Sequence, residues 1–334
     1  MKIIKYQPRE NPIPELLTFV REKYGDKKNF DFFFSDFQKA YSFCVENPNI
    51  NFIPFSILED KQLVAHIALI IDKRLPRGKA FLGFFEINQR LPLFEIWEKL
   101  REEARKMGIS RLLGPVNGSI WHQYRCIKGT DDSEYFKSEP MSESYYYKLL
   151  TQMKPVSEVS YYSASREKFD KVMRVIETGF KKLATAGFEI KEVRKVSYEQ
   201  LGTIAEISRI VFSNTGWGYT ELTDKEFLQL YSSDKLELHL NKLYLLFKDQ
   251  QIVGYCGTSK ENERTLILKT ICILPKYQGL GLGNAIAYKV HLDAQKEGFK
   301  KVIYALIREE NQVKNFPKDD TVIFRRYAAF EFKI

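Results

Sequence analysis

The chain has 334 residues, of which 44% are hydrophobic and 28% charged, and its net charge is +9. That length suits two domains, and that composition excludes an intrinsically disordered chain. No block of about five or more like charges occurs, so we expect an anionic ligand such as a nucleotide cofactor, and no nucleic acid, as a partner.

The first half alternates apolar runs with amphipathic stretches in the order of an α/β sandwich. A dense aliphatic run at 62–71 predicts a strand that is buried on both faces. Gly108 predicts the end of a helix, because glycine favours the position just past a helix C-terminus. The predicted strands are 2–6, 53–59, 62–71, 80–87, 111–114 and 156–165, and the predicted helices are 15–23, 31–46, 93–107 and 144–152.

A long helix at 166–183, with Ser165 as its N-cap residue, is predicted to join the two halves. No flexible linker rich in Gly, Ser or Pro separates them, so we expect the halves to pack tightly. The predicted domains are 1–165, a connecting helix at 166–186, and 187–334.

The second half begins again with a strand and two helices. Ser197 and Thr223 are predicted to cap these helices, because their hydroxyl groups can accept from the first backbone N–H groups. The predicted strands are 188–196, 243–248, 252–259, 265–274, 301–307 and 324–332, and the predicted helices are 198–212, 224–231 and 284–298.

A glycine-rich turn separates the strand at 265–274 from the next helix. Gln278 opens the turn, and Gly279, Gly281 and Gly283 alternate with leucines through it. Glycine lets the backbone adopt positive φ and approach a bulky anion, and the unpaired N–H groups of a helix start attract negative charge. The turn therefore predicts a site for phosphate or pyrophosphate.

Two common phosphate loops do not fit this turn. A Walker loop needs Gly-Lys-Ser/Thr, whereas Gly283 is followed by Asn284 and Ala285. A dinucleotide fingerprint needs G-x-G-x-x-G, and the spacing here is G-x-G-x-G. A glycine-rich turn without a ligand is the remaining alternative.

The pattern that fits is Q-x-x-G-x-G, formed by Gln278, Gly281 and Gly283 and preceded by Ile273 and Pro275. It resembles the acetyl-CoA signature of the Gcn5-related N-acetyltransferase (GNAT) superfamily, V-x-P-x-x-[QR]-x-x-G-x-[GA], and the resemblance covers about residues 187–334. The resemblance implies an α/β (α+β) fold, with a mixed, mostly antiparallel sheet flanked by helices, and acetyl-CoA or another acyl-CoA as cofactor. The cofactor-binding residues that it implies are Cys272, Ile273, Leu274, Gln278, Gly279, Leu280, Gly281, Leu282, Gly283, Asn284 and Asn311.

The resemblance also implies where the acyl group lies. In GNAT folds, two neighbouring strands splay apart to admit the pantetheine arm; here these strands end at Leu274 and near Ile307. The acyl group is expected beside a bulge around 272–274. Many members carry a Glu base on the first of these strands and a Tyr acid on the helix after the second, and this sequence has neither at those positions. The catalytic candidates are Tyr327, Lys269 and Glu309, the last with Glu310 or a chain of water molecules as the alternative base.

The first half resembles a degenerate copy of the same fold, so we expect two tandem GNAT-like acyl-CoA N-acyltransferase folds. Its expected phosphate segment, 85–93, contains no glycine. The segment G-P-x-x-G-x-x-W-x-x-Y-R at 114–125, together with the strand at 324–332, is similar to bacterial tandem-GNAT proteins. The substrate-binding candidates are Trp121, His122, Tyr124 and Arg125 in this segment and Trp217 and Tyr219 in the second half, and a structural role in the core is the alternative for each.

The expected function is transfer of an acyl group, acetyl in the first instance, from acyl-CoA to an amine of a small molecule or a peptide. A CoA-binding sensor or scaffold without turnover is the alternative. Fem-type peptidyltransferases share the fold but use aminoacyl-tRNA, and the intact turn argues against them. Mycothiol synthase is also a tandem GNAT protein, and the sequence shows no motif for its substrate.

The remaining features predict a protein without a metal or a membrane segment. The four cysteines and four histidines are scattered, with no metal-ligand spacing. No apolar run approaches the roughly 18 residues of a membrane span, and the start of the chain lacks the apolar core of a signal peptide. We therefore expect a cytoplasmic location.

Overall fold

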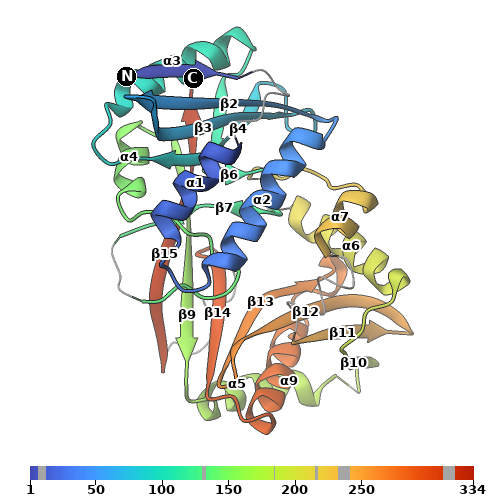
Figure 1. The fold of residues 1–334 in the computed structure, drawn as a ribbon. Helices are drawn as coiled ribbons and strands as arrows, with labels where there is room; N and C mark the ends of the chain where they lie inside the picture. The colour runs from blue at the N-terminus through green and yellow to red at the C-terminus, as the bar shows by residue number, and fades with distance from the viewer. Residues whose placement is uncertain (7–12, 130–132, 184, 215–216, 232–240, 311–319) are drawn as a thin grey trace. The chain divides into compact units, whose positions relative to one another are not determined.

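The computed structural model describes residues 1–6, 13–129, 133–183, 185–214, 217–231, 241–310 and 320–334 (Figure 1). The contacts divide the chain into two compact units. Unit 1 comprises Met1–Tyr161, Gly218–Thr220 and Arg325–Ile334, and unit 2 comprises Tyr162–Trp217 and Glu221–Phe324.

Unit 1 is built on a sheet with the strand order β1-β2-β3-β4-β5-β15, and β8 also pairs with β15. Pairing is antiparallel from β1 to β4, parallel between β4 and β5, and antiparallel between β5 and β15. β6 and β7 form a separate hairpin. The strands are β1 Lys2–Lys5, β2 Ile50–Glu59, β3 Gln62–Asp72, β4 Lys79–Ile87, β5 Arg111–Gly114, β6 Val116–Asn117, β7 Gln123–Tyr124, β8 Cys126–Ile127, β9 Ser157–Arg166 and β15 Thr321–Lys333, of which β9 and β15 each contribute residues to both units.

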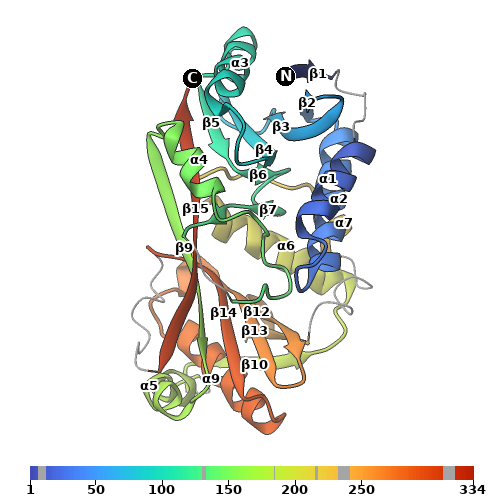
Figure 2. The same cartoon turned by 60° about the vertical axis from the view of Figure 1, so that its left-hand side comes forward.

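The helices of unit 1 cover both faces of its sheet (Figure 2). α1 and α2 lie side by side on one face, where Tyr24 and Phe33 meet edge to face at 5.5 Å. The aromatic side chains of α2 recur every three or four residues, which places them in one buried stripe. The helices are α1 Ile13–Tyr24, α2 Phe30–Glu46, α3 Leu93–Lys106 and α4 Tyr146–Gln152.

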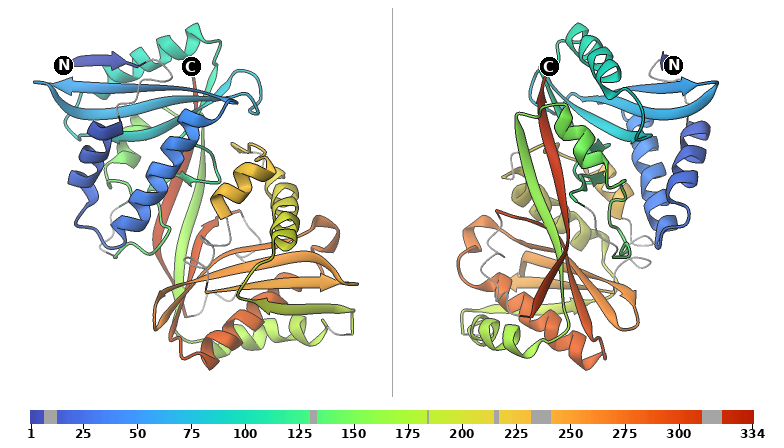
Figure 3. Two further views of the ribbon diagram at one scale, coloured as in Figure 1. Left: turned by 45° about the vertical axis from the view of Figure 1, so that its right-hand side comes forward. Right: turned by 90° about the vertical axis from the view of Figure 1, so that its left-hand side faces the viewer.

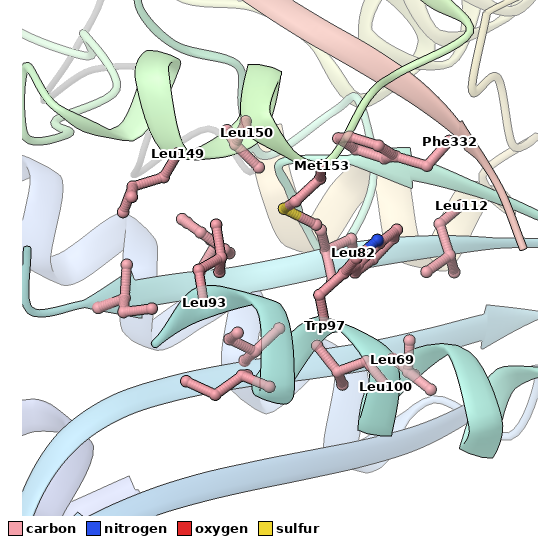
Figure 4. Packing of buried hydrophobic residues seen from close by; sticks show 14 of the residues in the cluster. Leu69, Leu82, Leu93, Trp97, Leu100, Leu112, Leu149, Leu150, Met153 and Phe332 are labelled. Carbon is pink, nitrogen blue, oxygen red and sulfur yellow. The ribbon is translucent and has the colours of Figure 1, made fainter. Parts of the chain in front are cut away.

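The other face of this sheet carries the largest apolar cluster of unit 1 (Figure 4). α3 contributes Leu93, Trp97 and Leu100 among others, α4 contributes Leu149 and Leu150, and strands such as β3, β4 and β5 contribute further side chains. Trp97 meets Phe332 of the last strand at 5.3 Å between ring centroids. The C-terminal strand is thus part of this core.

Unit 2 has the strand order β10-β11-β12-β13-β14, antiparallel except for the parallel pair β13–β14. α5 and α9 lie side by side on one face and α6 lies on the other (Figures 1 and 3). The strands are β10 Phe188–Val193, β11 Lys242–Lys248, β12 Gln251–Asn262, β13 Thr265–Ile273 and β14 Lys301–Arg308, and the helices are α5 Asp170–Lys181, α6 Tyr198–Ser213, α7 Asp224–Tyr231 and α9 Leu282–Lys296.

Two of the three predicted helix caps are confirmed. The Ser197 hydroxyl accepts from the Gln200 N–H, and the Gln200 side chain accepts in return from the Ser197 N–H. In the same way, the Thr223 hydroxyl accepts from the Glu226 N–H, and the Glu226 carboxylate accepts from the Thr223 N–H. The prediction for Ser165 is wrong: Ser165 lies in β9, and α5 begins only at Asp170. The residues around Ser165 are part of a β-strand. A serine side chain is compatible with a strand as well as with a helix N-cap, so the residue type alone does not decide between them.

The last ten residues, Arg325–Ile334, fall in unit 1, although the sequence predicts that they belong to a domain at 187–334. Phe330–Lys333 pair with Arg111–Gly114 of β5, and the Phe330 and Phe332 rings are fully buried. The C-terminal strand therefore completes the sheet that the N-terminal half begins.

Two buried histidines predict how stability depends on pH. Burial lowers the pKa of His66 in unit 1 and of His291 in unit 2 to about 4. An unfolded histidine has a pKa of about 6.5, so the unfolded chain takes up protons first as the pH falls below that value. The stability that these neutral rings contribute is complete above about pH 6.5 and is lost as the pH falls toward 4.

We expect His66→Met to reduce the loss in free energy of unfolding between pH 7 and pH 5 by about 2 kcal/mol. Urea unfolding at the two pH values measures this. Burial raises the pKa of Glu139 to about 7, which changes stability in the opposite direction in both proteins and cancels in the comparison. An identical pH dependence in the variant would contradict the assignment.

Candidate functional site

The glycine-rich turn lies between β13 and α9 of unit 2. Pro275–Tyr277 form a short 3-10 turn, and Gly281 is the N-cap residue of α9. Gly279 has a φ of 80° and Gly281 a φ of 76°, a region that other residues adopt only with strain. A Cβ atom added at Gly279 would meet no atom within 4 Å, and one at Gly281 would meet only the Cα of Gly179 at 3.9 Å. The backbone conformation requires these glycines, and the space around them is open.

Backbone donors gather at the start of α9. The Ala285 N–H donates to the Gly281 carbonyl over 3.1 Å, which is the first hydrogen bond of the helix. The N–H groups of Leu282, Gly283 and Asn284 precede it, so they have no partner one turn earlier in the helix. The helix dipole adds partial positive charge at the same place. The arrangement can bind an oxyanion that approaches from solvent.

Gln278 has a structural task in this turn. Its Nε2 donates to the Ile273 carbonyl over 2.9 Å and so ties the turn to the end of β13. The neighbouring Leu280 side chain is 61% exposed. The conformation of the turn is thus fixed from its first residue, while its middle faces solvent.

Gly179 of α5 is a residue of this site that the sequence analysis missed. A Cβ atom at Gly179 would lie 2.9 Å from the Gly281 carbonyl oxygen and 3.5 Å from the Asn284 Cβ. The absence of a side chain lets α5 pack directly on the turn and on the first residues of α9. A lone glycine inside a helix is a weak signal, because the residue that it faces here is about 100 positions away in sequence.

The two strands beside the turn separate early. β13 pairs with β14 from Thr265–Lys301 to Leu268–Tyr304. On the other side, Thr258 pairs with Leu268 and Gly257 with Thr270, so Lys269 is the extra residue of a β-bulge. The bulge expected around 272–274 is therefore wrongly placed, since Cys272 and Ile273 pair regularly with Tyr255 and Gly254. The strands separate where the extra residue breaks the register.

Residues 204–315 match the model of the acetyltransferase (GNAT) family. They include most of α6, all of α7, β13, β14 and the glycine-rich turn, whereas Gly179 lies outside them. This segment is therefore similar to GNAT domains in sequence. No curated protein matches the chain in sequence.

The fold of the whole chain resembles that of solved GNAT proteins. A tandem GNAT protein from the clavulanic acid biosynthesis pathway aligns with a TM-score of 0.58 and 10% identity, over 99% of this chain and 98% of that one. A GCN5-related N-acetyltransferase from Sphaerobacter thermophilus aligns with a TM-score of 0.52 and 10% identity over 99% and 95%. A GCN5-related N-acetyltransferase from Anabaena variabilis aligns with a TM-score of 0.53 and 12% identity, over 99% of this chain and 72% of that one. The prediction of two tandem GNAT folds with mixed, mostly antiparallel sheets is confirmed.

Four of the substrate-binding candidates lie together in the 114–125 segment of unit 1. The Trp121 Nε1 donates to the Thr220 carbonyl over 2.8 Å, and its ring lies 6.2 Å from that of Tyr219. His122 Nδ1 lies 2.9 Å from the Ser119 hydroxyl, and the His122 ring packs on Phe43 at 4.5 Å. These contacts show Trp121 and His122 holding neighbouring segments in place.

The other candidates are placed as follows. The guanidinium carbon of Arg125 lies 3.8 Å from the ring centroid of Tyr124. Both residues line a pocket of unit 1. Trp217 is half-buried in unit 2, whereas Tyr219 belongs to unit 1. As substrate-binding residues all of these stay predictions.

The catalytic candidates are scattered. Tyr327 is fully buried in unit 1, where its hydroxyl donates to the carboxylate of Glu139. Glu309 is exposed in the turn after β14, and Lys269 is exposed at the β-bulge. Asn311 lies outside the described residues. Of these, Lys269 is the residue that the described structure places beside the separating strands.

A buried cluster in unit 1 was also missed. Glu86 at the end of β4 accepts hydrogen bonds from the hydroxyl groups of Tyr146 over 2.7 Å and of Tyr24 over 3.1 Å, and Lys23 Nζ lies 3.6 Å from the same oxygen. These residues are 60 or more positions apart, except for Lys23 and Tyr24, so local patterns do not bring them together. A single carboxylate that follows six apolar residues or glycines in a strand is the signal that could have pointed to it.

Within the described ranges, no group of three or more His, Cys, Asp or Glu side chains could hold a metal ion. None of the helices described is both long and apolar enough to cross a bilayer.

The packing of α5 on the turn makes a prediction about Gly179. Gly to Ala inside a helix normally stabilises by about 0.5–1 kcal/mol. We expect the opposite for Gly179→Ala, with a loss of roughly 1–3 kcal/mol because the new methyl group overlaps the Gly281 carbonyl. Thermal unfolding of the variant measures the sign.

Gly202→Ala in α6 is the matched control, because an added Cβ atom there meets nothing within 4 Å. It should stabilise by the usual amount. Equal effects of the two substitutions would show that α5 does not press on the turn.

Proposed function

We propose that this protein is an acyl-CoA-dependent N-acyltransferase that moves an acyl group, acetyl in the first instance, to a primary amine. The observation that carries the proposal is the open, glycine-shaped helix start of α9 in a domain that matches the GNAT family. A pyrophosphate needs several donors on one side and no side chain in the way, and this turn supplies both.

The residues of the turn fit an acyl-CoA. The N-H groups of Leu282, Gly283 and Asn284 would hold the pyrophosphate, with Gly279 and Gly281 leaving room for it. Ile273 and Leu274, at the end of β13, would contact the pantetheine arm where the strands separate. An acyl-CoA supplies the activated thioester carbonyl for the reaction.

Transfer would be direct, from the thioester to the amine. Burial raises the pKa of the Cys272 thiol to about 12, so no thiolate nucleophile forms on β13 at neutral pH. Beyond Leu268, β13 no longer pairs with β14. Backbone N–H groups on this unpaired edge of β13 can stabilise the oxyanion of the transition state. The chain thus contributes positioning and backbone donors.

The acceptor side is best assigned to α6 and α7. An open depression of ≈ 520 Å³ is lined by Glu206, Arg209, Glu221 and Asp224, with Gly202 and Ile210. Arg209 is bonded to Asp224 over 2.6 Å, so the lining has a net negative charge. A negative surface favours an acceptor that carries a positive charge, as a protonated amine does.

Binding of CoA without turnover is the second candidate. The observation in its favour is that β13, TLILKTICI, carries no carboxylate. Release of CoA thiol in the presence of acetyl-CoA and a panel of primary amines distinguishes the two. Thiol release above the hydrolysis background with any amine supports the transferase, and binding without release supports the sensor.

The turn itself is tested by Gly281→Val. A β-branched residue cannot adopt the φ of 76° without strain, and its methyl groups would enter the space assigned to the pyrophosphate. We expect acetyl-CoA affinity, measured by calorimetry, to fall by about a hundredfold or more, corresponding to about 3 kcal/mol.

Gly283→Ala is the matched control. Gly283 has no positive φ, and its Cβ atom would make an ordinary contact with Ile273 at 3.8 Å. Affinity within about threefold of the wild type is expected. Wild-type affinity in Gly281→Val, or an equal loss in both variants, would contradict the assignment.

The stoichiometry should be one CoA per chain, bound by unit 2. In unit 1, the segment between β4 and α3 uses its own donors: the N–H groups of Asn88, Leu91 and Leu93 bond to carbonyl groups nearby, and Pro92 has none. Calorimetric titration with CoA measures the number of sites. Two equivalent sites would show that unit 1 also binds CoA and would contradict this prediction.

A further inference from the structure

Unit 1 contains a pocket at the place where β4 and β5 separate. The two strands pair only from Lys79–Arg111 to Phe81–Leu113. Beyond them, Phe84 adopts a φ of 47°, and its N–H donates to the Asn117 side-chain oxygen over 2.7 Å. The pocket has a volume of ≈ 20 Å³, enough for a group about the size of a water molecule.

Glu86 forms part of the wall of this pocket. The hydrogen bonds from Tyr24 and Tyr146 and the ion pair with Lys23 all reach one oxygen, Oε2. Among the described residues, no bond is made to Oε1. A carboxylate has about four acceptor sites, so this group can still accept from a donor inside the pocket.

Gln123 of β7 contributes a second acceptor. Its Nε2 donates to the Phe33 carbonyl over 3.1 Å, which fixes the orientation of the amide. Its Oε1 is buried and receives no hydrogen bond from any described residue. A buried acceptor without a donor is unfavourable, and such groups usually bind a water molecule or a ligand.

The charges around the pocket are balanced. Arg125 lies between the rings of Tyr124 and Tyr161, with its guanidinium carbon 3.8 Å and 4.0 Å from their centroids. Lys23 is the other cation, and Glu143 acts on both Lys23 and Glu86 as a second carboxylate. Of these four groups Arg125 and Glu86 line the pocket, one of each sign, so an entering cation meets no excess of positive charge from its walls.

We propose that unit 1 binds a primary ammonium group in this pocket, with Glu86 and Gln123 as its acceptors. An ammonium group carries three donors and no acceptor, which complements two open acceptors. Its single heavy atom suits the volume, and the rest of the molecule would remain outside. The proposal does not depend on acyl transfer by unit 2.

The size of the pocket provides the sharpest test. Ethylammonium presents the proposed group, whereas tetramethylammonium carries the same charge but is too large and has no N–H donor. Met141 lines the pocket and is one of five methionines in the chain. Full-length protein labelled with ¹³C at the methionine methyl groups therefore reports binding through one signal, which a Met141→Leu variant identifies.

We expect ethylammonium chloride to shift the Met141 signal in a saturable way and to leave Met107 and Met153 unchanged. Tetramethylammonium chloride at the same ionic strength should cause no saturable shift. The proposal is overturned if Met141 does not respond, or if both salts shift it equally.

Two variants test the acceptors. Glu86→Gln removes the charge, Gln123→Leu removes the amide oxygen, and each should weaken ethylammonium binding about tenfold or more. Gln89→Leu, an exposed glutamine beyond the end of β4, is the matched control and should bind as the wild type does.

Thermal unfolding shows which variants keep the fold. If Glu86→Gln does not fold, because its hydrogen bonds also hold α1 and α4, Gln123→Leu decides the outcome. Wild-type affinity in a folded Gln123→Leu protein overturns the proposal, and a loss confined to the pocket variants supports it.

Discussion

Both units depend on one feature of their sheets, a parallel strand pair that ends after three or four residues. In unit 2, β13 leaves β14 after Leu268, and in unit 1, β4 leaves β5 after Phe81. A strand edge that loses its partner must satisfy its N–H and C=O groups elsewhere. The early separation thus creates a position where backbone donors and space for a ligand coincide, and the candidate groups of each unit lie beside it.

The two units fill this separation differently. In unit 1, the chain after β5 enters the gap: the Val116 carbonyl lies so close to Gly83 that a Cβ atom there would be 2.3 Å away, and Asn117 binds the Phe84 N–H. A small pocket lies beside these residues. In unit 2, the corresponding strand leads into a turn whose glycines face open space. This difference in space supports the two proposals, a large anionic ligand for unit 2 and a small cationic group for unit 1.

Two contacts hold the turn of unit 2 in place. Gln278 fixes it to β13 from one side, and Gly179 lets α5 approach it from the other. Because the first residues of α9 are fixed by these contacts, their N–H groups are oriented before a ligand arrives. Preorganised donors bind an anion without a further ordering cost.

Features that depend on neighbours three or four residues away could be predicted from the sequence. The reciprocal cap of Ser197 and Gln200 is such a feature, and so is the positive φ of Gly281, since glycine spacing after a strand indicates a turn directly. Tertiary structure decided the rest. Ser165 joined a strand, Arg325–Ile334 completed the sheet of unit 1, and Glu86 met Tyr146 across 60 residues. Such contacts follow from which surfaces are buried together, and local propensity carries no information about a partner that distant.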